Sequence, residues 1–576
     1  MKWGPDRWRL YALALREAGR ALRGAVAPRP RSGSIRRVLI APQDLRTADA
    51  TAAGDIYAGY FAFAGRSVAT GGRSPFAVEP PTRAWGEALY GFGWLRHLRA
   101  AETALARANA RALVAEFIGK RPPRLARATP VLARRTLSFL SQSPLLLEGA
   151  DHVFYQRFLR AIERGARELA RDMAFAPRPI DRLVAAVALS SLGLCCEGME
   201  RVLRRATRVL ARELDRQILP DGGHRSRNPQ AAVDLLLDLL PLRQTFAARG
   251  LEPPPALVGA IDRMLPLLRL LRHGDGALAR FNGMSLTAAG ELATLLMYEG
   301  ARGRAMRRAP HSGYERLEAG ETVVIVEAGP APAPEDAAEA HAGCLSFELS
   351  SGAHALVVNC GAARGGADGM RLAARSTAAH STAVLDETSS GRFLVPHGFI
   401  LDRWIAAWLT RRLGPALIRG PRAVPAERAE EDGAQRLSAS HDGYRLLGLA
   451  HARRLSLSGS GGRLDGEDAF TPLGKGRAAE PAAIRFHIAP GVRASRAEGG
   501  AILLLLPNRE AWHFTAEGAE AALEESLFLA ASEGTRRTEQ IVLAFTAATP
   551  QVRWRFEHLP RPSERAPPAE APRPML

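Results

Sequence analysis

The sequence has almost no lysine. Among its 78 basic residues only Lys2, Lys120 and Lys475 are lysines, so the other 75 are arginines, and 59 acidic residues leave a net charge of +19. A field of this sign attracts polyanions such as nucleic acid, an anionic membrane or an acidic polysaccharide. The alternative is that arginine replaces lysine through a GC-rich codon bias and is scattered over helix surfaces. Zinc-finger spacing, an RNA-recognition signature and basic-zipper heptads are all missing, so we do not expect nucleic acid as a partner.

Cysteine is also scarce. The chain has four cysteines, and two of them, Cys195 and Cys196, are neighbours, which rarely bridge each other. The other two, Cys344 and Cys360, are not part of a CxxC pair either. These spacings support neither a disulfide framework nor a thiolate zinc site.

Long apolar runs are missing as well. No stretch approaches the roughly 18 uncharged apolar residues of a membrane-spanning helix. Near the basic N-terminus the apolar run 10–15 is short, and Arg16 and Glu17 interrupt it. We interpret this segment as an amphipathic helix rather than a signal peptide. The proline-rich end, residues 560–576, is expected to be disordered.

The first half has helical periodicity. Between Met199 and Leu219 the apolar residues recur three or four positions apart, with arginine and glutamate between them, which predicts one amphipathic helix. Similar stripes recur in Ala101–Phe117, Phe154–Met173, Ile180–Leu194, Gln230–Leu240, Ala256–Leu271 and Ser285–Tyr298. Helices in succession without strands between them predict a bundle, a toroid or a solenoid, and no fixed-period repeat selects a named array.

After about residue 310 the apolar period changes to two or to short runs bounded by turn residues. Examples are Thr322–Glu327, Leu345–Leu349, Ala355–Val358, Ile484–Ile488, Ala501–Leu506 and Gln540–Phe545. Many short strands of this kind predict an antiparallel β-sandwich. The sequence therefore predicts a multidomain α+β protein with a basic N-terminal segment (1–40), a helical domain (41–310), a sandwich (311–559) and a proline-rich tail (560–576).

Several motifs resemble the heparinase II/III family of polysaccharide lyases. They are residues 341–349 (HAGCLSFEL), 356–361 (LVVNCG), 374–382 (ARSTAAHST), 441–444 (HDGY) with His451 and Arg453, and, in the helical half, 221–229 (DGGHRSRNP). The resemblance implies an (α/α) toroid followed by an antiparallel β-sandwich, with β-elimination of uronic-acid polysaccharides in a groove between them. It also implies a cell-envelope or periplasmic location, to which the cytoplasm is the alternative because no signal peptide is seen.

Cleavage by β-elimination makes definite demands on side chains. The C5 proton of a uronate is weakly acidic, so donors must neutralise its carboxylate before a tyrosine or histidine removes the proton. By resemblance, the expected catalytic residues are His224, Asn228 and His380. The expected substrate-binding residues are Arg225, Arg227, Gln230, Arg375 and Asn282, and the expected partner is an anionic polysaccharide.

The chain departs from the family at two catalytic positions. Ala231 stands where the family has a tyrosine, and Glu339 stands where it has a histidine. Tyr298 and Tyr314, near the domain junction, either replace that tyrosine or belong to the core. Structural alternatives also stay open for the loop: Asn228 before Pro229 is a good helix N-cap, with His224 an ordinary surface residue, and Asn282 is a typical turn residue.

A structural zinc is held by two histidines and an aspartate in some family members. The matching residues here are His341, His380 and Asn359, and Gly343 replaces a nearby aspartate. Two imidazoles and an amide make a poor zinc site. The alternative is that the two histidines hydrogen-bond to each other or to the backbone inside the sandwich. No cofactor is required by the expected chemistry.

Two hypotheses follow from these residues. In the first, the chain is a divergent lyase that cleaves an anionic polysaccharide with His224 and a relocated tyrosine or histidine. In the second, it is a catalytically inactive relative that binds an anionic glycan or acts in assembly of the cell envelope. The fold alone does not decide between them.

Overall fold

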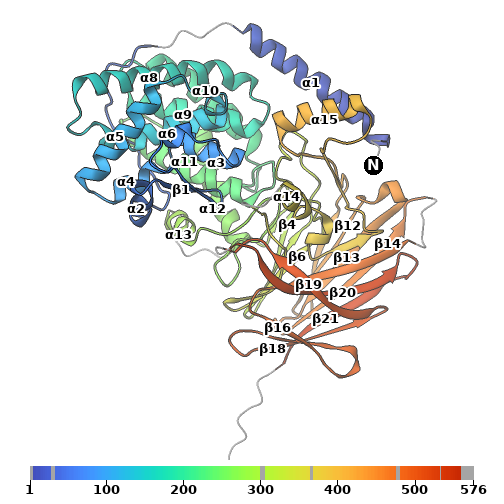
Figure 1. Cartoon of the computed structure of the whole chain (residues 1–576). Helices are drawn as coiled ribbons and strands as arrows, with labels where there is room; N and C mark the ends of the chain where they lie inside the picture. Colours follow the sequence, from blue (N-terminus) through green and yellow to red (C-terminus); the bar gives the residue numbers. More distant parts are fainter. Residues whose placement is uncertain are drawn as a thin grey trace, which may run out of the picture.

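The computed structural model describes residues 4–27, 33–298, 305–363, 368–474, 480–531 and 534–559. Its elements follow the predicted order of helices first and antiparallel strands second (Figure 1), except for a hairpin of β1 (Tyr60–Phe63) and β2 (Arg66–Ala69) among the first helices. The proline-rich tail predicted at 560–576 lies outside the described residues. None of the helices in the described ranges has the length and apolar content needed to cross a bilayer.

The helical domain has inner and outer helices. The inner helices α6 (Thr129–Ser141), α9 (Pro179–Cys195) and α11 (Pro229–Ala248) are buried along most of their length. Outer helices are α8 (His152–Asp172), α10 (Glu200–Gln217) and α12 (Pro255–Leu270), each with one buried stripe. The other helices of this half are α2 (Thr51–Tyr57), α3 (Arg83–Gly91), α4 (Leu95–Ala100), α5 (Ala104–Gly119), α7 (Ser143–Leu147) and α13 (Ala289–Met297).

Helix α11 continues past the point where its predicted apolar stripe ends. The sequence predicts helix over Gln230–Leu240, but α11 runs through Pro241 to Ala248. Proline has no N–H to donate to the carbonyl four residues earlier, here that of Leu237. The helix continues because Leu242 and Phe246, in the turns after Pro241, are buried in the core of the helical domain.

The second half is a sandwich of two antiparallel sheets. One has the strand order β11-β12-β13-β14-β21-β18-β17-β16, and the other has the order β19-β20-β15-β7-β6-β5-β4-β3 with β8 beside β15. Apolar side chains from both sheets, such as Phe347, Phe486, Phe514 and Phe556, pack between them.

The strand bounds of the sandwich are as follows. The first sheet contains β11 (Ala426–Glu431), β12 (Ala434–His441), β13 (Leu449–Leu457), β14 (Arg463–Pro472), β16 (Arg493–Arg496), β17 (Ile502–Leu505), β18 (Ala511–Glu517) and β21 (Val552–Leu559). The second contains β3 (Arg308–Ala309), β4 (Tyr314–Ala319), β5 (Thr322–Glu327), β6 (Phe347–Ser351), β7 (His354–Val358), β8 (Ala383–Leu385), β15 (Pro481–Ile488), β19 (Glu520–Phe528) and β20 (Arg536–Thr546).

Two further helices, α1 and α15, belong neither to the toroid nor to the two sheets. Helix α1 (Arg7–Val26) is the amphipathic helix predicted at the N-terminus, and α15 (Ile400–Leu413), inserted between strands of the second half, was not predicted. The two helices pack against each other although nearly 400 residues separate Arg7 from Asp402, which form an ion pair (Figure 1). Their joint core contains Leu10, Leu13 and Leu409.

Candidate functional site

The loop before α11 carries most of the expected site residues, and it is fixed to the sandwich. Within it, Ile218 and His224 form a β-bridge, and Gly222 has a φ of +87°. A Cβ at Gly222 would lie 1.9 Å from the Arg263 carbonyl oxygen, so the close approach requires glycine there. The Asp221 carboxylate accepts hydrogen bonds from the Ser312 N–H at 2.7 Å and the Ser312 hydroxyl at 2.6 Å.

His224 lies inside this loop rather than on its surface. Its side chain is buried, with Nε2 3.0 Å from the Gln217 side-chain oxygen and Nδ1 2.8 Å from the Ser226 hydroxyl. Burial, with the nearby Arg225 charge, lowers the pKa of His224 to about 3. The ring is therefore neutral at pH 7, and both of its nitrogens are engaged by this loop and the helix before it.

Arg227 is the centre of a buried polar network at the junction of the two domains. Its guanidinium donates to the Ser312 carbonyl at 2.7 Å and to the Gly329 carbonyl at 2.8 Å, and it forms an ion pair with Glu327 at 3.1 Å. Its backbone φ is +59°, and the Tyr314 hydroxyl donates to its carbonyl. Arg227 therefore binds its own chain, not solvent.

Asn282 belongs to the same network. Its amide donates to a Glu327 carboxylate oxygen at 2.8 Å and to the Tyr314 hydroxyl oxygen at 3.1 Å, while its side-chain oxygen accepts from the His341 N–H at 3.1 Å. Burial raises the pKa of Glu327 despite the charge of Arg227, and it raises the pKa of Tyr314 far above its usual value. Tyr314 is thus a core residue of the junction.

Three expected site residues lie at the edge of this junction. Arg225, about one third exposed, forms an ion pair with Asp336 at 2.6 Å. The Asn228 side chain accepts from the Gln230 N–H at 2.9 Å and so caps α11, as the structural alternative predicted. The Gln230 amide donates to Asp234 at 3.0 Å.

The two positions where the chain departs from the family differ in exposure. Ala231 is buried in the first turn of α11, with no functional group to offer. Glu339 is exposed, and a Cβ placed on Gly283 would lie 2.8 Å from the Glu339 Cβ and 2.9 Å from Asn228 Nδ2. Asn228, Gly283 and Glu339 therefore meet at the outer edge of the junction.

The Arg375 guanidinium is hydrogen-bonded to backbone carbonyls. Its guanidinium donates to Ala340 at 2.7 Å, Pro415 at 2.8 Å and Ala337 at 3.2 Å, and its carbon lies 4.7 Å from the Phe393 ring centroid. Burial lowers its pKa to about 10. The side chain joins three segments of the sandwich half instead of facing a ligand.

The residues at the family's zinc position do not fit a zinc ion. His341 Nδ1 lies 2.9 Å from His380 Nε2, and His380 Nδ1 donates to the Ser376 carbonyl at 2.7 Å. His380 Nε2 then carries the lone pair and His341 Nδ1 the proton, so the two lone pairs do not converge. The two histidines thus hydrogen-bond to each other, as one alternative predicted.

Asn359, the third expected ligand, and Gly343, which replaces a nearby aspartate, are equally unsuited. The Asn359 side-chain oxygen is used by the Ser381 N–H at 2.9 Å. A Cβ at Gly343 would lie 2.5 Å from the His380 ring, so the ring fills the space of a carboxylate there. In the ranges that the structure describes, no group of three His, Cys, Asp or Glu side chains could hold a metal. Zinc prefers thiolate, imidazole or carboxylate ligands, and this set offers two imidazoles that already hydrogen-bond to each other, with no thiolate or carboxylate beside them among the described residues.

Sequence reasoning found the histidines of β12 and β13 only as parts of a resemblance and missed their carboxylate partner, Asp468. Asp468 on β14 accepts from His451 at 2.6 Å, from Arg453 at 2.8 Å and from the Trp554 indole at 2.8 Å. The Arg453 charge holds the pKa of Asp468 far below its usual value although burial opposes this. No local pattern marks Asp468, because its partners come from other strands.

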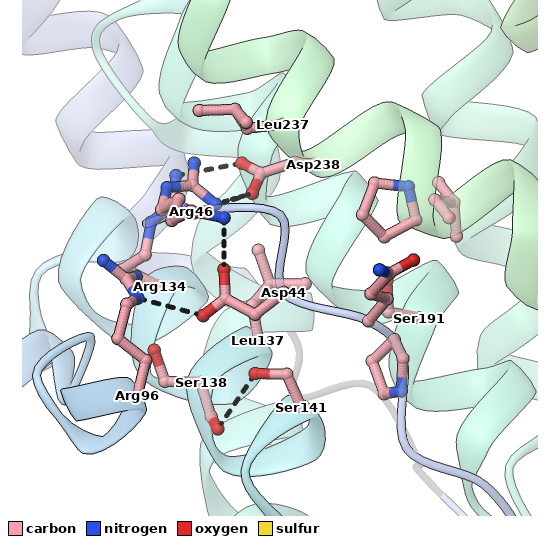
Figure 2. Close-up of a pocket in the computed structure, with 14 residues that line it drawn as sticks. Asp44, Arg46, Arg96, Arg134, Leu137, Ser138, Ser141, Ser191, Leu237 and Asp238 are labelled. Carbon is pink, nitrogen blue, oxygen red and sulfur yellow. Dashed lines mark hydrogen bonds and ion pairs between the residues drawn. The ribbon is translucent and has the colours of Figure 1, made fainter. Parts of the chain in front are cut away.

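Two hollows lie away from this junction. The first, of about 30 Å³, is lined by Asp44 and Arg46 and by residues of α4, α6, α9 and α11 (Figure 2). Asp238 binds Arg134 and Arg46 there, and Asp44 binds Arg96. A space of this size holds water rather than a sugar. The second, of about 380 Å³, lies on the solvent face of the β12-β13-β14-β21-β18 strands.

Comparison with known proteins shows which protein family and fold this chain resembles. Residues 301–556 match the model of the heparinase II/III-like C-terminal domain. A crystal structure of heparinase III matches with a TM-score of 0.68 and 11% identity, over 96% of this chain and 92% of that chain. A mutant heparan sulfate lyase of Pedobacter heparinus matches with a TM-score of 0.59 and 13% identity, over 95% and 88%. These matches confirm the predicted α/α toroid followed by a β-sandwich.

The chain belongs to the heparinase II/III-like family. Among curated proteins it is similar to FtsZ-localized protein C of Caulobacter vibrioides (strain NA1000 / CB15N), with 32% identity over 543 residues, covering 90% of this chain and 88% of the relative. The identity with this relative is therefore well above that with the lyase structures, and it extends over both halves of the chain.

Proposed function

We propose that this chain is a catalytically inactive member of the family that acts as an assembly protein at the bacterial division site. The observation that carries the proposal is the loop before α11. Where the family has its tyrosine the chain has the buried Ala231, and His224 is enclosed with both ring nitrogens hydrogen-bonded. A general base must reach within hydrogen-bonding distance of the proton it removes, and neither residue offers that.

The remaining polar residues support the same conclusion. Neutralising a uronate carboxylate requires donors that face the substrate. Arg227, Asn282 and Arg375 instead donate to buried carbonyls and to Glu327. Arg225 and Asn228, at the edge, are held by Asp336 and by the α11 cap. The catalytic and substrate-binding roles expected from resemblance stay predictions, and these contacts favour structural roles.

The division-site part of the proposal comes from the relative named after its localisation with FtsZ. A chain that meets FtsZ must share its compartment, so localisation of this chain also tests where in the cell it acts. Glycan binding without cleavage is the second candidate, supported by the net charge of +19, which attracts an anionic glycan.

A lyase assay tests the absence of catalysis. The purified chain is incubated with heparan sulfate, alginate or hyaluronan while absorbance from unsaturated uronate is followed, with a known lyase as the positive control. We expect no increase. An increase that Glu339→Gln or Asn228→Ala removes would show that the edge residues form an active site and would overturn the proposal.

Localisation tests the assembly role separately. A fluorescent fusion is expected to gather at the division site and to disperse when FtsZ is depleted, and the purified chain is expected to sediment with FtsZ polymers. A uniform signal, with no co-sedimentation, contradicts the assembly role and leaves the absence of catalysis standing. Retention on immobilised heparan sulfate, lost at moderate salt, would favour the glycan-binding candidate instead.

A further inference from the structure

Helix α1 carries apolar residues on both of its long faces. Leu10 and Leu13 point inward and are buried. On the other side Trp8, Leu15 and Leu22 are exposed by 65%, 77% and 67%. Because they are seven residues apart, these three side chains form one stripe along the helix. A helix that only packed on its own chain would place polar residues there.

The inner face of α1 is fixed mainly by buried charges. Asp6, just before the helix, binds Arg392 at 3.2 Å and Arg419 at 3.0 Å. Two ion pairs join α1 to α15, between Arg7 and Asp402 at 3.1 Å and between Glu17 and Arg412 at 3.5 Å. These ion pairs set the rotation of α1 about its axis, so the outward direction of the stripe is a fixed feature of the fold.

The first turn of α15 extends the apolar surface. Ile400, Leu401 and Trp404 are exposed by 76%, 57% and 73%. The Arg7 guanidinium carbon lies 5.6 Å from the ring centroid of Phe399, which places the first turns of α1 and α15 side by side (Figure 1). Large apolar side chains gathered in this way are rare on a surface without a partner.

The exposed charges on the two helices themselves are arginines, of which Arg16 is paired with Glu335 at 2.8 Å. On α1 the exposed face carries Arg16 and Arg23, while Glu17, the acidic residue of this helix, is buried. On α15 the exposed charges are Arg403 and Arg411, since Asp402, its acidic residue, is buried. Tryptophan and aliphatic side chains flanked by arginine are typical of helices that lie in the interface of an anionic membrane.

We propose that the outward stripe of α1 and the first turn of α15 form a docking face for an anionic lipid surface. The face consists of Trp8, Leu15, Leu22, Ile400, Leu401 and Trp404, which enter the interfacial layer while the nearby arginines contact lipid headgroups. A second copy of the chain fits less well, because arginines at positions 9, 16 and 23 would face those of the copy along one flank of the stripe. The proposal is independent of catalysis and of FtsZ.

Vesicle sedimentation tests the docking face. The full chain is mixed with phosphatidylcholine vesicles with or without phosphatidylglycerol, and we expect binding only to the anionic vesicles. Trp8→Glu and Trp404→Glu should each weaken binding by about tenfold or more, since burying one large apolar side chain contributes about 1.5–3 kcal/mol. Leu105→Glu, on α5 and 64% exposed, is the matched control and should bind normally.

Two further measurements distinguish binding to an anionic lipid surface from other uses of this face. Arg23→Glu with Arg403→Glu should reduce binding to anionic vesicles, and added salt should do the same. Circular dichroism should show all variants folded, because every substituted side chain lies on the surface. Equal binding by wild type, Trp8→Glu and Trp404→Glu, or no vesicle binding at all, overturns the proposal. A dimer in analytical ultracentrifugation that Trp8→Glu dissociates would make the face a self-interface and also overturn it.

Discussion

At the scale of single residues, the arginines that the sequence offers as substrate contacts serve mainly as internal connectors. Of these, Arg227 and Arg375 are buried and donate to backbone carbonyls of segments far away in the chain, and Arg453, in a family motif of the sandwich, does the same. Arginine suits this use because its planar guanidinium has five N–H donors and stays charged. The excess of arginine is therefore partly structural, which net charge alone does not reveal.

Replacing Arg227 tests the junction network. Arg227→Met leaves Glu327 buried without its cation, and we expect a loss of about 3 kcal/mol in the free energy of unfolding, measured by urea titration. Combining it with Glu327→Gln should recover part of the loss, because the uncompensated charge disappears. Arg454→Met is the control, since the Arg454 side chain is 70% exposed and its ion pair with Glu467 should contribute less than about 1 kcal/mol.

The buried histidines predict a loss of stability in mild acid. The pKa of His224 is about 3 in the folded chain and about 6.5 in an unfolded one, so between these values the unfolded chain binds the extra proton. Stability from this group is full above pH 6.5 and falls as the pH drops, by about 2 kcal/mol between pH 7 and pH 5. His224→Gln, measured by urea titration at both pH values, should lose about that much less than wild type. An equal loss in both proteins would show that His224 is protonated in the folded chain.

At the scale of elements, the helices and strands were largely predictable because their patterns are local. The stripe of α10 and the short apolar run of β5 predict each element almost to its ends. The continuation of α11 through Pro241 was missed because tertiary burial outweighs the local effect of proline. Helix α15 was missed because its apolar residues face both the core and solvent, so they form no single stripe.

The N-cap of α11 gives a prediction at this scale. Asn228→Ala removes the acceptor of the Gln230 N–H and is expected to cost about 1 kcal/mol in unfolding free energy, whereas Asn228→Asp keeps the acceptor and should cost little. Chemical denaturation of the three proteins measures both values. A neutral Asn228→Ala variant would mean that the side chain is not needed by the helix and is free for another role.

At the scale of the whole molecule, the sequence predicts where the candidate site lies. It does not predict which of the site's side chains are buried and which are exposed. The motif at 221–229 does lie at the junction of the two domains, as the resemblance implies. The buried contacts of the Arg227 side chain are made with Ser312, Gly329 and Glu327 from the other domain. Contacts between residues about a hundred positions apart leave no mark in a local pattern.

The same contacts predict that the toroid and the sandwich unfold together. Asp221 takes its hydrogen bonds from Ser312, and the Arg316 guanidinium donates to the carbonyls of Leu270 and Arg272 at 3.1 and 2.7 Å. Separation would leave these buried groups without partners, at about 1–3 kcal/mol each. We therefore expect one calorimetric transition for the full chain, and a separately expressed toroid, residues 33–298, should unfold at a much lower temperature or not fold.

Two well-separated transitions in the full chain would mean that the junction couples the domains only weakly. Arg227→Met should then leave both transitions in place, whereas in a coupled protein it should lower the single one.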